Sequence, residues 1–166
     1  MNIILFGFKG SGKTHFGRLL AKKLNRPFFD TDDILVSLYG TSHTNKEIYE
    51  ILGEKAFRLL EKKAIDTLMQ MQNSIIALGG GTILDPDNLN NLQKIGKLVY
   101  LEVRYETIES RKLSTALGPL KPLYETRKPL YESIPAKKIS VDLLDETHVI
   151  EILSSYALQK DFSYGF

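Results

Sequence analysis

The residues with the most specific chemistry lie near the start of the chain, in the segment 7–14 (GFKGSGKT), directly after an apolar run at residues 3–6. The segment matches the pattern G-x-x-x-x-G-K-[ST] of a phosphate-binding loop. Its glycines permit a tight turn that brings backbone N–H groups against phosphate oxygens. Lys13 can reach the β- and γ-phosphates of a nucleotide, and the Thr14 hydroxyl can join the coordination sphere of Mg²⁺. The segment therefore predicts a binding site for a nucleotide and magnesium.

Two carboxylates form a second candidate group. Asp30 and Asp32 follow a short apolar stretch at residues 28–29, and on an extended segment their side chains would face the same way. One carboxylate could hold Mg²⁺ through water while the other accepts a hydrogen bond from an attacking hydroxyl. The alternative is that Asp32 or Asp33 caps the helix that follows, and we expect that role for Asp33. For Asp30 and Asp32 we favour a functional role, because they would lie beside the phosphate-binding loop.

Three consecutive glycines, Gly79, Gly80 and Gly81, follow the apolar segment 74–78. They could be no more than a flexible connection between a strand and a helix. Beside a phosphate-binding loop, however, the better interpretation is that the backbone approaches a small polar ligand and offers its N–H groups to it.

Arg58 and Arg127 are candidates for binding an anionic acceptor, because a guanidinium group matches a carboxylate in a bidentate manner. For Arg58 the alternative is an ion pair within its own helix, with Glu54 or Glu61. Such a pair contributes only about 0.3–0.5 kcal/mol when it is exposed. Periodicity alone leaves both interpretations open.

Predicted strands and helices alternate along the chain. Strands are expected at residues 3–6, 28–29, 74–78, 97–103 and 138–141, and helices at 14–24, 33–39, 44–52, 54–71, 86–95, 107–113 and 146–156. Residues 114–126 are predicted to form a loop. This order indicates βαβ units and a mainly parallel sheet with helices on both faces. Ligands bind outside the carboxyl ends of such strands, so the loop, the aspartates and the glycines are expected to meet in one cleft.

Length and composition exclude several other classes of protein. A chain of 166 residues fits one domain, and the absence of cysteine excludes disulfides, thiolate metal sites and a catalytic thiol. The net charge of +2 and the scattered lysine pairs argue against a nucleic-acid partner. The apolar runs are too short to span a bilayer, and no signal peptide is apparent. We therefore expect a single cytoplasmic domain, residues 1–166, with a C-terminal tail at 159–166.

Taken in order, these segments resemble shikimate kinases over about residues 1–141. The motifs that carry the resemblance are the loop at 7–14, Asp30-Thr31-Asp32, Phe57-Arg58 with Glu61, Leu78 with the three glycines, and Arg127-x-Pro129-Leu130-Tyr131. The loop is shared by a very large superfamily, whereas the other motifs are more specific. The resemblance implies ATP-dependent phosphorylation of the 3-hydroxyl of shikimate, in the route to chorismate and the aromatic amino acids.

The resemblance also implies a role for each matching residue. Lys13, Asp32 and Arg58 would be catalytic, with Asp32 meeting the shikimate hydroxyls and acting as a base. Thr14 and Asp30 would surround Mg²⁺. ATP would be bound by Gly10, Ser11, Gly12, Lys13, Thr14, His15 and Arg111, the last of these near the adenine. Shikimate would be bound by Asp32, Arg58, Gly79, Gly80, Gly81 and Arg127.

The fold implied by the resemblance is a three-layer α/β/α kinase fold, with a five-stranded parallel sheet of order 2-3-1-4-5 and a lid. The expected lid, residues 114–126, is short and carries Lys121-Pro122-Leu123 where the family usually has Arg-Pro-Leu. Residues 143–146 also lack the basic side chains that often flank adenine. The alternatives are another small-metabolite kinase, such as a gluconate kinase, or a nucleotide-binding module with weak catalysis. The expected partners are shikimate and ATP, with no nucleic acid and no membrane, and the expected state is a monomer.

Overall fold

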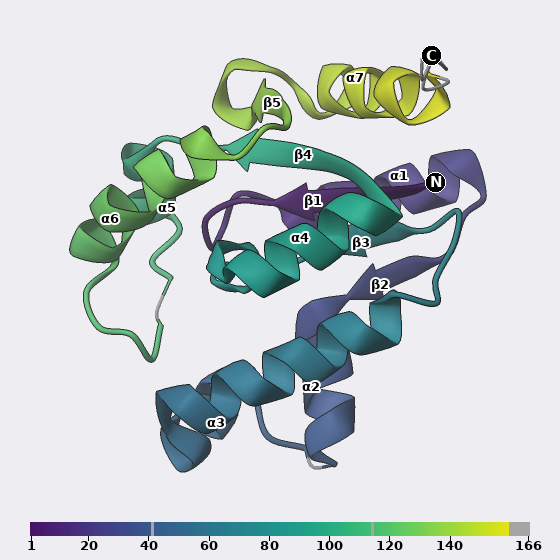
Figure 1. Cartoon of the computed structure of the whole chain (residues 1–166). Coiled ribbons are helices and arrows are strands. Elements are labelled where there is room, and N and C mark those ends of the chain that lie inside the picture. Colours follow the sequence, from purple (N-terminus) through teal and green to yellow (C-terminus); the bar gives the residue numbers. More distant parts are fainter. Residues whose placement is uncertain (41, 114, 160–166) are drawn as a thin grey trace.

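The computed structural model describes residues 1–40, 42–113 and 115–159. Its centre is a parallel sheet in the order β2-β3-β1-β4-β5 (Figure 1). The strands are β1 Asn2–Phe6, β2 Phe28–Asp30, β3 Ile75–Ala77, β4 Gly96–Glu102 and β5 Lys137–Ser140. The predicted α/β fold and strand order are therefore confirmed.

The central strand β1 is buried along its whole length, with Ile3 to Phe6 at 0–1% exposure. A parallel strand covered on both faces has this continuous apolar sequence. Ile4 lies between Ile76 of β3 and Leu98 of β4 in the sheet register. Leu5 pairs with Ala77, which in turn pairs with Asp30 at the end of β2. The segments that follow these three strands therefore begin at the same edge of the sheet.

The helices are α1 Lys13–Leu24, α2 Thr31–Tyr39, α3 Asn45–Leu68, α4 Pro86–Ile95, α5 Tyr105–Ser110, α6 Leu120–Ser133 and α7 Glu146–Leu158, with short 3-10 turns η1 Thr82–Leu84 and η2 Val141–Leu143. The chain crosses the sheet in one direction from β1 to β2 and in the other from β3 to β4. Right-handed crossovers therefore place α1 and α4 on opposite faces. Helix α4 lies in front of the sheet in Figure 1.

Helices α2 and α3 pack together beyond the β2 edge of the sheet (Figure 1). They share a small apolar cluster of Leu35, Ile48 and Phe57 that is separate from the main core. The break predicted at Gly53 is present, because this residue has φ +75° inside α3. None of the helices in the described residues is long and apolar enough to cross a membrane.

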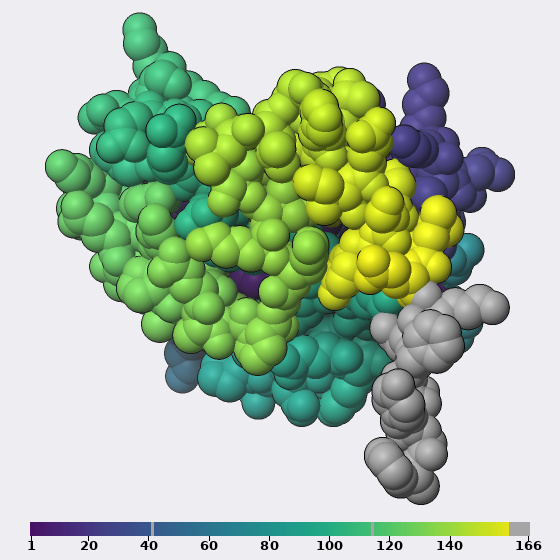
Figure 2. Space-filling model, turned by 90° about the horizontal axis from the view of Figure 1, so that it is seen from above, coloured from purple at the N-terminus to yellow at the C-terminus, as the bar shows by residue number. Residues whose placement is uncertain are grey.

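The predicted loop at residues 114–126 is wrong from Leu120 onward, where helix α6 begins. Pro119 is the N-cap of this helix and Pro122 lies in its first turn, where the missing N–H would have had no helical partner. The predicted helix at 107–113 is also displaced, since α5 spans Tyr105–Ser110. Figure 2 shows α6 in green and α7 in yellow on one face of the molecule.

Candidate active site

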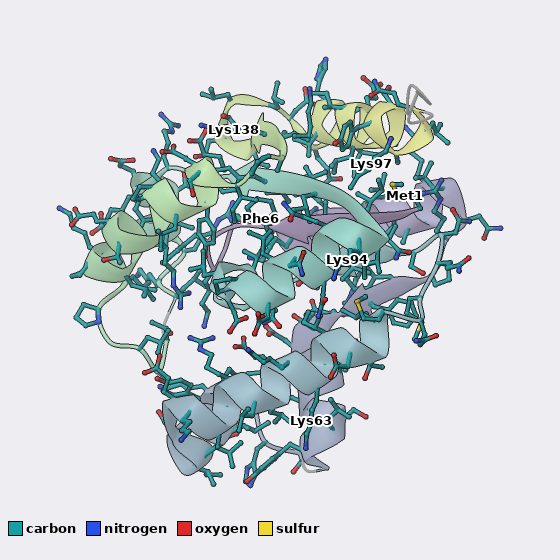
Figure 3. The ribbon with its side chains drawn as sticks, viewed as in Figure 1. Met1, Phe6, Lys63, Lys94, Lys97 and Lys138 are labelled. Atoms are coloured by element: carbon teal, nitrogen blue, oxygen red, sulfur yellow. The ribbon has the colours of Figure 1, made fainter. Side chains whose placement is uncertain are left out.

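A cavity of about 450 Å³ lies at the edge of the sheet where β1, β2 and β3 end. In Figure 3, side-chain nitrogen and oxygen atoms gather between α3 and α4, beside this edge. All predicted site residues except Ser11 line the cavity: Gly10, Gly12, Lys13, Thr14, His15, Asp30, Asp32, Arg58, Gly79, Gly80, Gly81, Arg111 and Arg127. The structure thus brings residues from six separate segments into one site.

Lys13 folds back onto the loop that precedes it. Its Nζ donates hydrogen bonds to the carbonyl oxygens of Gly7 at 2.9 Å and Phe8 at 2.8 Å. Gly12 precedes the first turn of α1 with φ 88°, a left-handed conformation that glycine adopts without strain. Burial lowers the pKa of Lys13 to about 8, although Asp32 and Asp30 act in the opposite direction. The loop therefore provides a cation and a helix N-terminus, both of which favour phosphate.

Asp30 joins the loop to the strand edge. Its Oδ2 accepts a hydrogen bond from Thr14 Oγ1 at 2.7 Å, and its Oδ1 accepts one from the backbone N–H of Asp32 at 3.0 Å. Asp30 is therefore the N-cap of α2, and the expectation that Asp33 fills this role is wrong. Asp32 lies in the first turn of α2, so the two aspartates are not on one extended segment. They still line the same cavity.

Thr14 and Asp30 offer a hydroxyl and a carboxylate oxygen, the hard ligands that Mg²⁺ prefers. The described residues hold no cluster of three or more histidine, cysteine, aspartate or glutamate side chains that could bind a metal ion. Mg²⁺ is usually bound through one or two protein oxygens together with substrate phosphates and water. The donor set therefore fits magnesium held jointly with a nucleotide.

Asp32 faces the glycine segment. A Cβ atom at Gly79 would lie 2.8 Å from Asp32 Oδ1. The Asp32 side chain is accessible to water in the cavity. The surrounding walls nevertheless remove part of its bulk hydration and raise its pKa to about 6, with a further contribution from Asp30. Asp32 is therefore ionised at neutral pH. Its pKa is nevertheless close enough to neutral pH for the carboxylate to accept a proton during a reaction.

The two arginines meet at the end of the glycine segment. A Cβ at Gly81 would lie 2.8 Å from Arg58 Nη1 and 3.1 Å from Arg127 Nη2, and a Cβ at Gly80 would lie 3.3 Å from Arg127 Nη1. Neither glycine has a positive φ, so the missing side chain matters here for space and not for backbone conformation. The cavity wall at this point is thus backbone flanked by two guanidinium groups.

Arg58 makes the predicted ion pair with Glu61 and also reaches the cavity. Its Nη1 lies 2.5 Å from Oε2 of Glu61, and Arg58 also lines the cavity. Glu61 is buried, and its Oε1 accepts a hydrogen bond from Thr82 Oγ1 at 2.9 Å. The ion pair is therefore an anchor that fixes the arginine and not an exposed surface pair.

Tyr131, the last residue of the Arg-x-Pro-Leu-Tyr motif, is buried and donates a hydrogen bond to the carbonyl oxygen of Gly80. Burial raises the pKa of Tyr131 to about 12, which keeps its hydroxyl a donor at physiological pH. The contact holds the glycine segment against α6, the helix that carries Arg127.

The segment before α6 closes the other side of the cavity. Arg111 Nη1 donates a hydrogen bond to the carbonyl oxygen of Gly10, and Thr115 and Leu117 line the cavity. Lys121 is exposed, and its Nζ lies 5.9 Å from the ring centre of Tyr105. Lys121, which lies in the expected lid, is therefore directed at an aromatic ring.

His15 and Phe57 also belong to the site, together with Asn45 and Tyr49, which were not singled out from the sequence. His15 Nε2 lies 2.6 Å from Glu146 Oε2, which connects α1 to the start of α7. Asn45, Tyr49 and Phe57 also line the cavity, and the two aromatic rings are 5.2 Å apart in an edge-to-face arrangement. Helical periodicity places such residues on an apolar stripe, and it cannot separate a core face from a cavity wall.

Comparisons with known proteins agree with one another. A protein-family model described as shikimate kinase matches residues 9–160. A shikimate kinase of Xylella fastidiosa (strain M12) is 37% identical, with 85% of this chain and 83% of the relative covered. A shikimate kinase of Caldicellulosiruptor saccharolyticus is 36% identical, with 96% of this chain and 97% of the relative covered.

The solved structures give the same result. Shikimate kinase from Aquifex aeolicus is 31% identical with a TM-score of 0.77, and the alignment covers 94% of this chain and 96% of that chain. Shikimate kinase from Acinetobacter baumannii in complex with shikimate is 29% identical with a TM-score of 0.79, with 95% of each chain covered. The similarity thus extends over nearly the whole chain.

Proposed function

Since the chain belongs to the shikimate kinase family and is an ATP-dependent kinase, we propose that it transfers the γ-phosphoryl group of ATP to the 3-hydroxyl of shikimate. The observation that supports this substrate most strongly is the arrangement around the glycine segment. Two arginines meet at Gly81, and the carboxylate of Asp32 faces Gly79. The site therefore offers cations for a carboxylate and an acceptor for a hydroxyl, the two groups that shikimate carries.

The loop would hold the nucleotide. Lys13 Nζ now contacts two backbone carbonyls, and the phosphate oxygens of ATP would replace them as stronger, charged acceptors. The backbone N–H groups at the start of α1 would point at the same phosphates. Arg111, which contacts Gly10, would lie beside the loop on the side of the nucleotide.

Magnesium would be held by Thr14 Oγ1 and by Asp30, directly or through water. When it is bound, the metal neutralises charge on the phosphate oxygens of ATP. Asp30 keeps its second oxygen on the backbone of Asp32, so it would present one oxygen to the metal in a fixed direction.

On the acceptor side, Arg58 and Arg127 would bind the carboxylate of shikimate and orient its ring. The 3-hydroxyl oxygen would attack the γ-phosphorus while the bond from that phosphorus to the β,γ-bridging oxygen breaks, and ADP would leave. Asp32 would accept the hydroxyl proton, because its carboxylate is ionised at neutral pH. Each role is assigned to a group that lines the cavity.

The test is a coupled assay of ADP release with Mg·ATP and three acceptor conditions: shikimate, gluconate and no acceptor. We expect turnover with shikimate only. Turnover with gluconate would instead favour the other small-metabolite kinase. Binding of ATP without turnover on either acceptor would support a nucleotide-binding module, with the short lid as its cause.

We also propose that the protein acts as a cytoplasmic monomer. Support comes from the cavity, because residues of a single chain supply both the nucleotide side and the acceptor side of it. Light scattering coupled to size exclusion measures the mass in solution, and a mass near 18.8 kDa is the expected result.

A further inference from the structure

Asn45 is the first residue of α3 and lines the same cavity as Asp32, Arg58 and the three glycines. It belongs to none of the motifs that carry the family resemblance. Its polar side chain nevertheless stands beside Tyr49 and Phe57, on the acceptor side of the site.

The side-chain oxygen of Asn45 has no hydrogen-bond partner although it is shielded from water. Among the described residues only one other buried side-chain atom is unpaired, Nη1 of Arg26, which lies by a different cavity near Met1 and the end of α7. Buried polar atoms are nearly always paired, because removing them from water without a new bond is costly. Because Asn45 lines the ligand cavity, a small movement of its side chain would bring this unpaired acceptor to a donor on a bound ligand.

The nitrogen end of the same amide is occupied. Hydrogen bonding by the Asn45 side chain lowers the pKa of the Asp32 carboxyl, although burial and Asp30 raise it more strongly. An ionised carboxylate only accepts hydrogen bonds, so Asn45 donates from Nδ2. Oδ1 lies at the other end of the same amide and has no partner.

The start of α3 does not require the Asn45 side chain. Thr44 is the N-cap, and its Oγ1 accepts a hydrogen bond from the backbone N–H of Glu47 at 3.3 Å. Glu47 Oε2 accepts one from the backbone N–H of Thr44 at 2.7 Å. This reciprocal capping box satisfies the helix terminus, so capping does not explain why residue 45 is polar.

We propose that Asn45 is a specificity-determining residue that holds Asp32 with Nδ2 and accepts a hydrogen bond from a second hydroxyl of the acceptor with Oδ1. The inference rests on the proposed function, in which Asp32 meets the reacting hydroxyl. A polyhydroxylated carboxylate would then contact the arginines with its carboxylate, Asp32 with one hydroxyl and Asn45 with another. Acceptors that lack the second hydroxyl would leave Oδ1 unpaired, and they would be discriminated against.

The test compares the unsubstituted enzyme with Asn45→Ala and Asn45→Leu, each checked for folding by its thermal midpoint. Asn90→Ala is the control, since Asn90 is an exposed asparagine of α4 that does not line the cavity. The measurements are kcat and KM for shikimate, KM for ATP, and the same constants for shikimate analogues that each lack one ring hydroxyl other than the 3-hydroxyl.

We expect both Asn45 variants to raise KM for shikimate by about 5- to 100-fold, the range for one lost hydrogen bond in a buried site. KM for ATP should change less than about twofold. One of the analogues should have a high KM with the unsubstituted enzyme, because it cannot make the hydrogen bond to Asn45 Oδ1. Its KM should therefore rise little further in the Asn45 variants.

Other outcomes overturn the inference. An unchanged KM for shikimate in the folded variants would show that Asn45 does not contact the acceptor. If the substitutions raise KM by the same factor for shikimate and for every analogue, Asn45 acts only by holding Asp32. Absence of turnover by the unsubstituted enzyme would instead reject the proposed function, and the inference with it.

Discussion

Thr14 Oγ1 lies 2.7 Å from Asp30 Oδ2, so the second residue of α1 is tied to the last residue of β2. These two oxygens are the ones assigned to magnesium above. The contact shows that the hydroxyl and the carboxylate already occupy neighbouring positions, which reduces the reorganisation that metal binding requires.

Replacing Asp30 by asparagine tests the metal assignment. Asp30→Asn keeps a side-chain oxygen for capping α2 but removes the negative charge. We expect the Mg²⁺ concentration for half-maximal activity to rise by about tenfold or more, in the range for disturbed metal sites. Asp33→Asn is the matched control, because Asp33 does not line this cavity. The same Mg²⁺ dependence in both variants would reject the assignment.

Lys13 should make the stability of the unliganded protein depend on pH. The unfolded chain keeps the Lys13 proton up to a pKa near 10.5, whereas the folded protein loses it near 8. Between these values the unfolded state binds more protons, so the free energy of unfolding should rise with pH, by up to about 3 kcal/mol. Denaturant unfolding of the wild type and of Lys13→Met, compared from pH 7 to 10.5, isolates this contribution. If the difference in the free energy of unfolding between the two proteins stays constant over this pH range, the prediction is wrong.

Arg58→Ala should weaken acceptor binding more than nucleotide binding. The guanidinium group lies at Gly81, and loss of charged hydrogen bonds there is expected to raise KM for shikimate by about 10- to 100-fold. KM for ATP should change less than about threefold. Arg104→Ala, which removes an exposed arginine paired with Asp142 at 3.5 Å, serves as the control. If KM for both substrates rises equally, Arg58 is only the structural partner of Glu61.

Gly81→Ala should damage binding without unfolding the protein. Gly81 has φ −96° and ψ −16°, which alanine adopts readily, but the new methyl group would press on Arg58 and Arg127. We expect a thermal midpoint close to that of the wild type and a KM for shikimate raised by about tenfold or more. Gly40→Ala is the converse control, since Gly40 has φ +79° and open space around it. That variant should lose about 1 kcal/mol of stability and keep its KM.

The sequence predicts the fold well because its strongest signals are local and repeated. The loop at residues 7–14 fixes a strand before it and a helix after it, and the parallel arrangement then places the ends of β1, β2 and β3 at one edge. Convergence of Asp30 and the three glycines on the loop follows from that geometry alone.

The features that could not be predicted depend on contacts between distant segments. Pro119 and Pro122 read as loop residues, yet they are compatible with the start of α6, and the choice between the two is made by packing. The role of Asp30 as the N-cap of α2, in place of Asp33, depends on where β2 ends in the sheet. Asn45 belongs to no recognisable motif, and from the sequence it looks like an ordinary residue at the start of a helix. Only the structure shows that its side-chain oxygen is buried and unpaired.

The strand order has a consequence for how the nucleotide site forms during folding. β1 and β2 do not pair with each other, because β3 lies between them and pairs with both. The first crossover therefore leaves a gap one strand wide, which closes only when residues 75–77 enter the sheet. A nascent chain that ends before β3 contains the entire phosphate-binding loop and Asp30, but it lacks the strand that pairs with both β1 and β2. The site that comes first in the sequence is thus completed only after nearly half of the chain has been made.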